Sequence, residues 1–196
     1  RAAGTPVYDS LRQMLAAEHG RLDLVCVPTG IPLHRVMTTA VLEAGCHVLV
    51  EKPAAGSIQD VDAMIEARER SGRLAAVGYQ HLYLPSTRQI KAWLLEGRFG
   101  RPERLRGFGC WPRAAAYYGR NSWAGELAVD DTWVLDGPHN NALSHSLNVM
   151  CFLAGAAPEA TCQPETVRAE LYRAKPIASA DTAALRVTTA EGVEVF

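Results

Sequence analysis

Two short stretches of the sequence carry residues suited to acid–base chemistry. In the first, Glu51, Lys52 and Pro53 directly follow the apolar run HVLV. Pro53 fixes its own φ angle and restricts Lys52 to an extended backbone, which would orient the lysine. An ammonium group held in this way can stabilise a developing alkoxide. The alternative is a solvated charge pair in a loop.

The second stretch lies in an apolar segment that we predict to be one long helix, from about Pro138 to Ala154. Asn141, His145 and Asn148 are spaced i, i+4 and i+7, so they would share one face of that helix. Amides and an imidazole on an otherwise apolar helix are costly unless they find partners. Because an imidazole can accept a proton near neutral pH, His145 is a candidate general base. The alternative is a structural stripe of hydrogen-bonded groups.

The first part of the chain alternates between helical and strand patterns. A strand, a crossover helix and a second strand form a right-handed unit whose strands are parallel. Residues 1–80 therefore predict an α/β fold with a partial, doubly wound Rossmann-type sheet. The predicted elements are a helix at 9–20, a strand at 22–27, a helix at 33–45, a strand at 46–50, a helix at 57–72 and a strand at 74–79.

The pattern changes after the predicted boundary near residues 79–85. Residues 81–196 predict an α+β domain for substrate binding and dimerisation, with a mostly antiparallel sheet that is incomplete at its C-terminus. Asp136, which precedes Gly137 and Pro138, is predicted to be the N-cap of the long helix. The other predicted elements are a helix at 86–100, strands at 104–112 and 167–174, and a hairpin at 182–196 that turns at AEG.

Composition argues against several classes of protein. The chain has 196 residues, is 48% hydrophobic and carries a formal net charge of −1, so no basic surface for nucleic acid or anionic lipid is expected. It contains no apolar run long enough to span a membrane and no signal-peptide pattern. Its five cysteines are scattered without a CxxC pair, which predicts neither disulfides nor a metal site. We expect a cytoplasmic protein.

The segment DLVCVPTGIPLHRVMTTAVLEAGCHVLVEKPAAG, residues 23–56, resembles the Gfo/Idh/MocA oxidoreductases, relatives of glucose–fructose oxidoreductase and inositol dehydrogenase. The later segments WPR, YYGRNSWAG and NNALSHSLN agree, so the resemblance covers nearly the whole chain. It implies hydride transfer between NAD or NADP and a secondary hydroxyl or carbonyl of a sugar, polyol or related small molecule. It also implies a homo-oligomer that forms through the sheet of the second domain.

The resemblance assigns roles to individual residues. Lys52 would hydrogen-bond the reacting hydroxyl and the nicotinamide-side ribose, next to a Lys–Pro bond that is often cis in the family. His145 would be the acid/base. The family often has an aspartate four residues earlier, where this chain has Asn141, so the proton relay would rest on Lys52 and His145. The expected cofactor-binding residues are Pro28, Thr29, His34, Glu51, Lys52 and Pro53. The expected substrate-binding residues are Arg113, Tyr118, Asn121, Trp123, Asn141 and His145.

Some of these assignments leave alternatives open. For the loop residues 113–123, the alternative is surface or interface packing. Two other functions are also open: a non-catalytic sensor of a sugar or nucleotide derived from the same fold, and NAD-dependent glycoside cleavage. Fold alone does not choose among them.

The dinucleotide fingerprint G-x-G-x-x-G is absent from the sequence. In Rossmann folds these glycines let the backbone approach the pyrophosphate at a helix N-terminus. We therefore expect that the chain is truncated at both ends and that the glycine-rich first βα unit precedes Arg1. The 196-residue chain alone is predicted to bind the cofactor weakly or not at all, and tight binding in calorimetry would refute this.

Overall fold

The computed structural model describes residues 4–196. Its internal contacts divide the chain into two compact units, Arg1–Gly78 and Tyr79–Phe196. Each unit contains its own cluster of buried hydrophobic residues.

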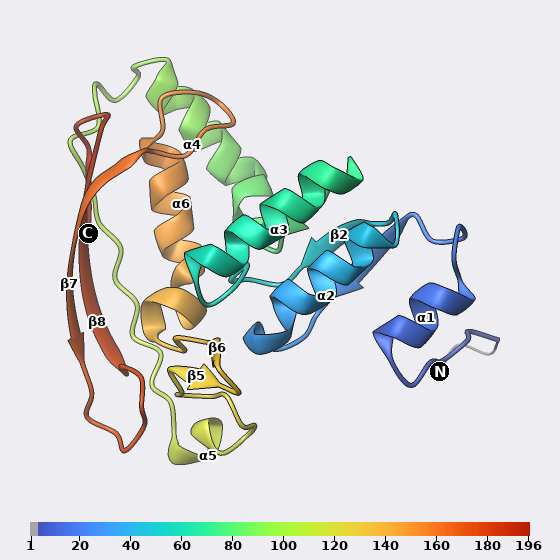
Figure 1. The fold of residues 1–196 in the computed structure, drawn as a ribbon. Helices are drawn as coiled ribbons and strands as arrows, with labels where there is room; N and C mark the ends of the chain where they lie inside the picture. Colours follow the sequence, from blue (N-terminus) through green and yellow to red (C-terminus); the bar gives the residue numbers. More distant parts are fainter. Residues whose placement is uncertain (1–3) are drawn as a thin grey trace. The chain divides into compact units, whose positions relative to one another are not determined.

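The first unit is a three-stranded parallel sheet with the strand order β1-β2-β3 (Figure 1). Helices connect its strands, which confirms the Rossmann-type α/β prediction for this unit. Its elements are α1 (Leu11–Ala17), β1 (Leu24–Val27), α2 (Ile31–Glu43), β2 (His47–Val50), α3 (Ile58–Ser71) and β3 (Ala75–Val77).

Alternation along the strands decides which face of this sheet is covered. Val25 and Val27 of β1 are buried, together with Val48 and Val50 of β2. They join one cluster with residues of α2 and α3, so these two helices cover that face. The intervening side chains, such as that of Leu49, are exposed on the opposite face.

The three strands end at the same edge of the sheet. Val27 pairs with Val50, and Val50 pairs with Val77. The next residues extend the ladder: the amide of Glu51 donates to the carbonyl of Val27 (3.2 Å), and the amide of Gly78 donates to that of Val50 (2.8 Å). The residues that follow β2, the central strand, therefore lie between the ends of its two neighbours.

The second unit contains a four-stranded sheet with the order β4-β9-β8-β7. β4 and β9 are parallel and the other two pairs are antiparallel, so the predicted mostly antiparallel sheet is confirmed. Gly192, at φ +75°, forms the predicted hairpin turn between β8 and β9. The strands are β4 (Arg104–Leu105), β7 (Pro164–Tyr172), β8 (Thr182–Thr189) and β9 (Glu194–Val195).

Helix α6 packs against this sheet through Leu147 and Met150, which contact the buried cluster that contains Val187 and Val195. Helix α4 lies along α6 (Figure 1). The remaining elements are η1 (Gln80–Tyr83), α4 (Pro85–Leu95), α5 (Ala115–Tyr118), β5 (Ala128–Val129), β6 (Thr132–Trp133), η2 (Pro138–Ala142) and α6 (Ser144–Ala154).

The predicted long helix at 138–154 is wrong because the chain breaks it at Leu143. Residues 138–142 form a π-helical turn in which the amide of Leu143 donates to the carbonyl of Pro138 (2.7 Å). The regular helix α6 begins only at Ser144. Asn141 is therefore not on the same regular helix as His145.

Two further local predictions are wrong. The predicted strand at 104–112 pairs with β9 only over Arg104–Leu105. Beyond it, the amide of Gly107 still donates to the carbonyl of Phe196 (2.8 Å), but residues 108–112 belong to no strand. Asp136 is not the N-cap either, since Gly137 occupies that position without a side-chain bond.

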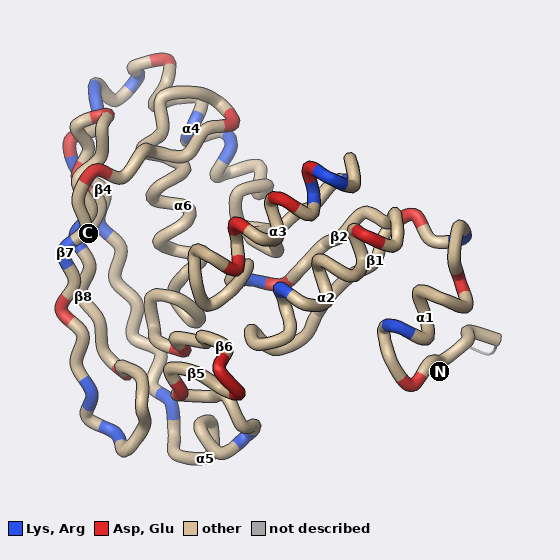
Figure 2. The backbone as a smooth tube through the Cα atoms, in the orientation of Figure 1, with Lys and Arg blue, Asp and Glu red and all other residues tan. Residues whose placement is uncertain are grey.

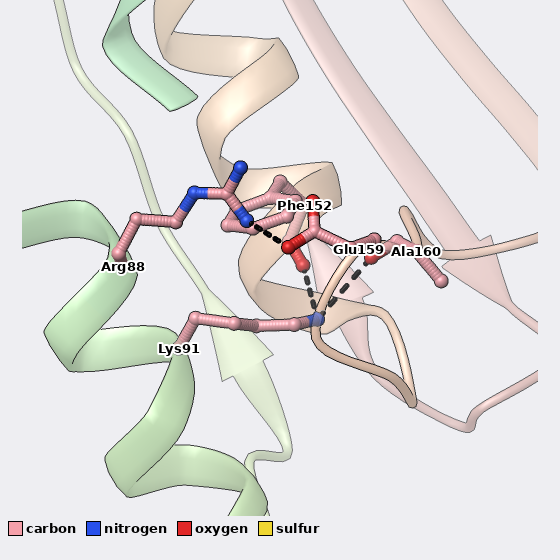
Figure 3. Close-up of polar contacts among 5 residues, drawn as sticks. All are labelled: Arg88, Lys91, Phe152, Glu159 and Ala160. Atoms are coloured by element: carbon pink, nitrogen blue, oxygen red, sulfur yellow. Dashed lines mark hydrogen bonds and ion pairs between the residues drawn. The ribbon is translucent and has the colours of Figure 1, made fainter. Parts of the chain in front are cut away.

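A buried lysine fixes the C-terminal end of α6 (Figure 3). Lys91 of α4 is 2% exposed, and its Nζ donates to the backbone carbonyl groups of Phe152 (2.6 Å), Ala160 (3.3 Å) and Gly155. Carbonyl groups in the last turn of a helix have no partner within the helix, so a cation is favourable there. Lys91 thereby connects α4, α6 and the loop after α6.

Both α3 and β7 carry acidic and basic residues rather than a stripe of one sign (Figure 2). Charged residues elsewhere form surface ion pairs, such as Arg88–Glu159 at 2.6 Å (Figure 3), and such pairs contribute little to stability individually. Within residues 4–196, no helix is long and apolar enough to cross a membrane. The same residues contain no group of three or more potential metal ligands.

Candidate active site

The loop after β2 carries Lys52, and its backbone is fixed at several points. The Lys52–Pro53 peptide bond is cis, as the resemblance implied. The carboxylate of Glu51 accepts a hydrogen bond from the amide of Lys52 (3.1 Å). A Cβ atom at Gly78 would lie 3.3 Å from the same carboxylate, so the glycine leaves room for it. Glu51 therefore holds the backbone of Lys52 and also places a carboxylate at the end of β2.

His34 links this loop to the loop after β1. Its side chain is 1% exposed. Nδ1 lies 2.7 Å from the carbonyl oxygen of Pro53, and Nε2 lies 3.0 Å from that of Thr29. Since both ring nitrogens face backbone carbonyl groups, the ring positions the two loops. We therefore expect His34 to contribute to cofactor binding through the two loops that it positions.

At this edge of the sheet, Thr29 is the residue whose side chain is best suited to hydrogen-bond a ligand. Its hydroxyl oxygen is buried and has no hydrogen-bond partner within residues 4–196. A buried hydroxyl without a partner is costly, so a ligand that hydrogen-bonds it would be favoured. This hydroxyl and the Lys52 ammonium provide hydrogen-bond donors at this edge of the sheet. Such donors suit the hydroxyl groups and the negative charge of a nucleotide. Pro28 separates Thr29 from the end of β1.

The second unit contains a pocket of about 80 Å³ among the predicted substrate residues. Arg113 lines it, with its guanidinium over the ring of Tyr117 (4.4 Å to the centroid) and near that of Trp111 (5.9 Å). The other polar residues of its lining include Tyr118, Asp136, Asn141 and Asp181. Aromatic rings beside hydrogen-bonding groups are typical of pockets that hold sugars or polyols.

Tyr118 is a hydrogen-bond donor in this pocket. Burial and the nearby carboxylate of Asp181 raise the pKa of its hydroxyl, whereas Arg113 acts in the opposite direction. The hydroxyl therefore keeps its proton throughout the neutral range.

Asp136 connects two segments that line the pocket. One carboxylate oxygen accepts from the amide of Gly125 (2.8 Å), and the other accepts from the Asn141 side chain (2.6 Å). The carboxylate is 6% exposed. Asp136 thus fixes the position of Asn141 instead of capping a helix.

Three predicted substrate residues, His145 and the loop residues Asn121 and Trp123, lie outside the lining of this pocket. The side-chain oxygen of Asn121 accepts from the amides of Trp123 (3.1 Å) and Ala124 (2.8 Å), which closes a turn. The ring of Trp123 packs against the guanidinium of Arg120, 5.2 Å from its centroid. Asn121 and Trp123 thus shape the loop.

His145, in the first turn of α6, lies in a group of rings that the sequence did not indicate. The ring of His81 is 4.5 Å away between centroids, and that of Tyr79 is 5.7 Å away and edge-on. The Tyr79 hydroxyl hydrogen-bonds Ser144, whose own hydroxyl donates to the carbonyl of Asn141 (2.9 Å). The available signal was that Tyr79 is the last residue of the strand predicted at 74–79 and that His81 follows it closely.

Comparison with known proteins places this geometry in a family. Residues 1–79 match the model of the Gfo/Idh/MocA oxidoreductase family, NAD-binding Rossmann fold. The chain belongs to the Gfo/Idh/MocA family. The suspected resemblance is therefore confirmed, and the NAD-binding character of the family agrees with the predicted nicotinamide cofactor.

Two curated members of the Gfo/Idh/MocA family extend the match into the second unit. A 1-carboxy-3-chloro-3,4-dihydroxycyclohexa-1,5-diene dehydrogenase of Comamonas testosteroni is 31% identical over 159 residues, which cover 74% of this chain and 38% of the enzyme. An inositol 2-dehydrogenase of Azotobacter vinelandii is 28% identical over 151 residues, covering 76% and 40%. The chain thus spans about two fifths of the length of these relatives.

A solved structure is similar over almost the entire chain. The WlbA dehydrogenase from Bordetella pertussis, in complex with NADH and UDP-GlcNAcA, matches with a TM-score of 0.84 and 28% identity. The match covers 99% of this chain and 55% of that one. The similarity includes both units.

Proposed function

We propose that the complete protein is an NAD(P)-dependent dehydrogenase that acts on a secondary hydroxyl of a sugar, polyol or related small molecule. The observation that carries this proposal is the loop after the central parallel strand, where Glu51 and His34 hold the backbone around Lys52. Ligands of open α/β sheets bind beyond the carboxyl ends of the strands, which is where this lysine lies.

The proposed chemistry divides between two side chains. His145 accepts the proton of the substrate hydroxyl, and the Lys52 ammonium stabilises the negative charge that develops on the oxygen. When bound, the nicotinamide accepts the hydride that leaves the carbon. In the reverse direction His145 returns the proton to the alkoxide.

The pocket around Arg113 supports a polyhydroxylated substrate. Its lining provides the donor groups of Tyr118 and Arg113 and the carboxylates of Asp136 and Asp181, which suit several hydroxyl groups. The names of the relatives agree, since two of them act on inositol or a dihydroxycyclohexadiene. We expect NAD to be preferred over NADP because the similar WlbA dehydrogenase binds NADH.

The test is a panel of sugars and polyols assayed with NAD and with NADP on the complete gene product. Formation of the reduced cofactor, followed by its absorbance, is the readout. Lys52→Ala should lower kcat by about 10²–10³-fold, as for the loss of one group that stabilises an oxyanion. Arg12→Ala, at an exposed cation of α1, is the control and should leave turnover unchanged. Near-normal turnover of Lys52→Ala would refute the proposed role.

The same assay separates the alternative functions. A sensor would be stabilised by sugar or nucleotide but would form no reduced cofactor with any substrate. An NAD-dependent glycoside-cleaving enzyme would release the aglycone of a glycoside without net reduction of NAD. Analysis of the products distinguishes both from simple dehydrogenation.

A further inference from the structure

We propose that Cys151 and Cys162 form a reversible disulfide when the folded protein meets a hydroperoxide, and that this bond links α6 to the segment that enters β7. The scattered spacing of the cysteines predicted no disulfide, but the fold brings these two thiols together. The proposal does not depend on the proposed dehydrogenase function, because it concerns a part of the second unit that takes no part in the suggested chemistry.

The backbones of the two cysteines are in direct contact. The amide of Cys162 donates to the carbonyl of Cys151 with an N···O distance of 2.8 Å. Standard covalent geometry on either side of this hydrogen bond keeps the two Cα atoms within about 6.7 Å of each other. Disulfides span Cα–Cα distances of about 4.4–6.8 Å, so this pair lies within the range that a disulfide can bridge.

The two side chains meet in the same part of the core. Cys162 is 5% exposed and belongs to the buried cluster that contains Val187 and Val195, and Cys151 packs against that cluster. The two thiols also hydrogen-bond each other. Cysteines whose side chains point apart cannot be bridged without movement of the backbone, and these side chains point toward each other.

The chain between the two cysteines is already held in place. The ammonium of Lys91 donates to the carbonyl groups of Gly155 and Ala160 (Figure 3). A Cβ atom at Gly155 would collide with the carbonyl oxygen of Ala160, so these two stretches of backbone are packed closely. Just beyond the second cysteine, the amide of Gln163 donates to the carboxylate of Glu191 (3.1 Å). Because these contacts exist in the reduced protein, the disulfide forms without reordering this loop.

The surroundings of the pair indicate that Cys162 is the thiol that loses its proton first. Burial raises the pKa of both thiols, to about 12 for Cys151. At Cys162 the hydrogen bond with Cys151 and the nearby ammonium of Lys91 act in the opposite direction, whereas the carboxylate of Glu191 adds to the rise. The thiolate is the form that attacks an oxidant. Cys162 therefore reacts first, and more slowly than an exposed thiol would.

Two steps give the disulfide. The Cys162 thiolate attacks one oxygen of hydrogen peroxide, the O–O bond breaks, and a sulfenic acid and a hydroxide ion are formed. The sulfur of Cys151 then attacks the sulfenic sulfur, so that the S–S bond forms as the S–O bond breaks. The proton of the Cys151 thiol leaves with the hydroxyl group as water. Both sulfurs are oxidised and the peroxide is reduced, and an added thiol reverses the bond by exchange.

The bond should make the protein harder to unfold. It closes a short loop between α6 and β7, which restricts the unfolded chain more than the folded one. For a loop of this length in a protein of this size, the melting temperature should rise by about 5–10 °C.

The test exposes the reduced, complete protein to a few equivalents of hydrogen peroxide under native conditions. The remaining thiols are then alkylated in urea, and the peptides are mapped by mass spectrometry. We expect a linked pair of peptides that contains Cys151 and Cys162 and that disappears after treatment with dithiothreitol. The oxidised protein should show the raised melting temperature, and dithiothreitol should return it to that of the reduced protein.

Cysteine variants provide the controls. Cys151→Ala and Cys162→Ala should each lose the linked peptides and the rise in melting temperature after oxidation. Cys46→Ala, at another buried cysteine, should keep both.

A redox buffer of oxidised and reduced dithiothreitol tests the same pair at equilibrium, whatever the rate at which peroxide enters the core. The proposal is overturned if wild type keeps Cys151 and Cys162 as free thiols in both treatments. It is also overturned if the linked peptides form without a rise in melting temperature, or if Cys162→Ala shows the same rise as wild type.

Discussion

Nδ1 of His34 lies 2.7 Å from the carbonyl oxygen of Pro53, so a side chain of α2 directly holds the loop that carries Lys52. The second ring nitrogen lies 3.0 Å from the carbonyl of Thr29. One buried imidazole therefore joins the loops after two adjacent strands. The orientation of Lys52 depends on this contact as well as on the proline that follows it.

Replacing His34 with phenylalanine should destabilise the protein and disturb the Lys52 loop. The change removes both ring nitrogens, and with them the N–H that donates to a backbone carbonyl group, which should cost about 1–3 kcal/mol in the free energy of unfolding. Chemical denaturation measures this cost, and kcat should fall as well. His19→Phe, at an exposed site, is the control. Unchanged stability and turnover in His34→Phe would contradict the positioning role.

Lys91→Met should also destabilise the protein, through the second unit. Methionine fills the space of the lysine stem but cannot donate to the carbonyl groups of Phe152, Gly155 and Ala160. We expect a loss of about 1–3 kcal/mol in the free energy of unfolding. Lys175→Met, at a more exposed lysine, should cost less than about 0.5 kcal/mol. Equal effects of the two substitutions would show that the buried ammonium is not a cap.

The stability difference between wild type and Lys91→Met should depend on pH. Burial lowers the pKa of Lys91 from its ordinary value of 10.5. Between the lowered pKa and 10.5 the unfolded chain binds more protons at this site than the folded chain, so stability rises with pH. Wild type should therefore gain stability relative to Lys91→Met as pH is raised through this window. A constant difference would contradict the shift.

Sequence patterns predicted the elements of the first unit because their physical signals are local. Apolar runs marked the three strands, and the helix predicted at 57–72 begins at Ser57, the N-cap of α3, whose side chain accepts from the amide of Asp60. The cis bond before Pro53 came from the family resemblance alone. The fold class followed from the order of these elements.

The errors in the second unit have non-local causes. The π-helical turn before Leu143 contains Asn141, whose side chain donates to Asp136, and hydrophobic periodicity does not reveal this hydrogen bond. The contact of His81 with His145 joins residues 64 positions apart (145 minus 81). No local pattern indicates such a contact. The homo-oligomer through the second-domain sheet stays a prediction, for which the exposed residues of β7 provide a surface.

Asp136→Asn should weaken substrate binding by loosening the wall of the pocket. An amide has one acceptor oxygen where the carboxylate has two, so it cannot accept from both Gly125 and Asn141 as Asp136 does. We expect a loss of about 1–3 kcal/mol in stability and a raised KM for the substrate that the panel identifies. Asp62→Asn, on the exposed side of α3, is the control. An unchanged KM would show that Asn141 does not depend on this carboxylate.

The cysteines should differ sharply in their reaction with iodoacetamide. Burial raises the pKa of Cys151 to about 12 and also raises that of Cys162. The thiolate is the reactive form, so at pH 8 only about one Cys151 thiol in ten thousand would be ionised. Cys26 and Cys110 are exposed. Peptide mass spectrometry of the native protein should therefore find label at Cys26 and Cys110 well before Cys151 or Cys162. Unfolding in urea should remove the difference, whereas early labelling of Cys151 in the native protein would contradict its burial between α6 and the sheet.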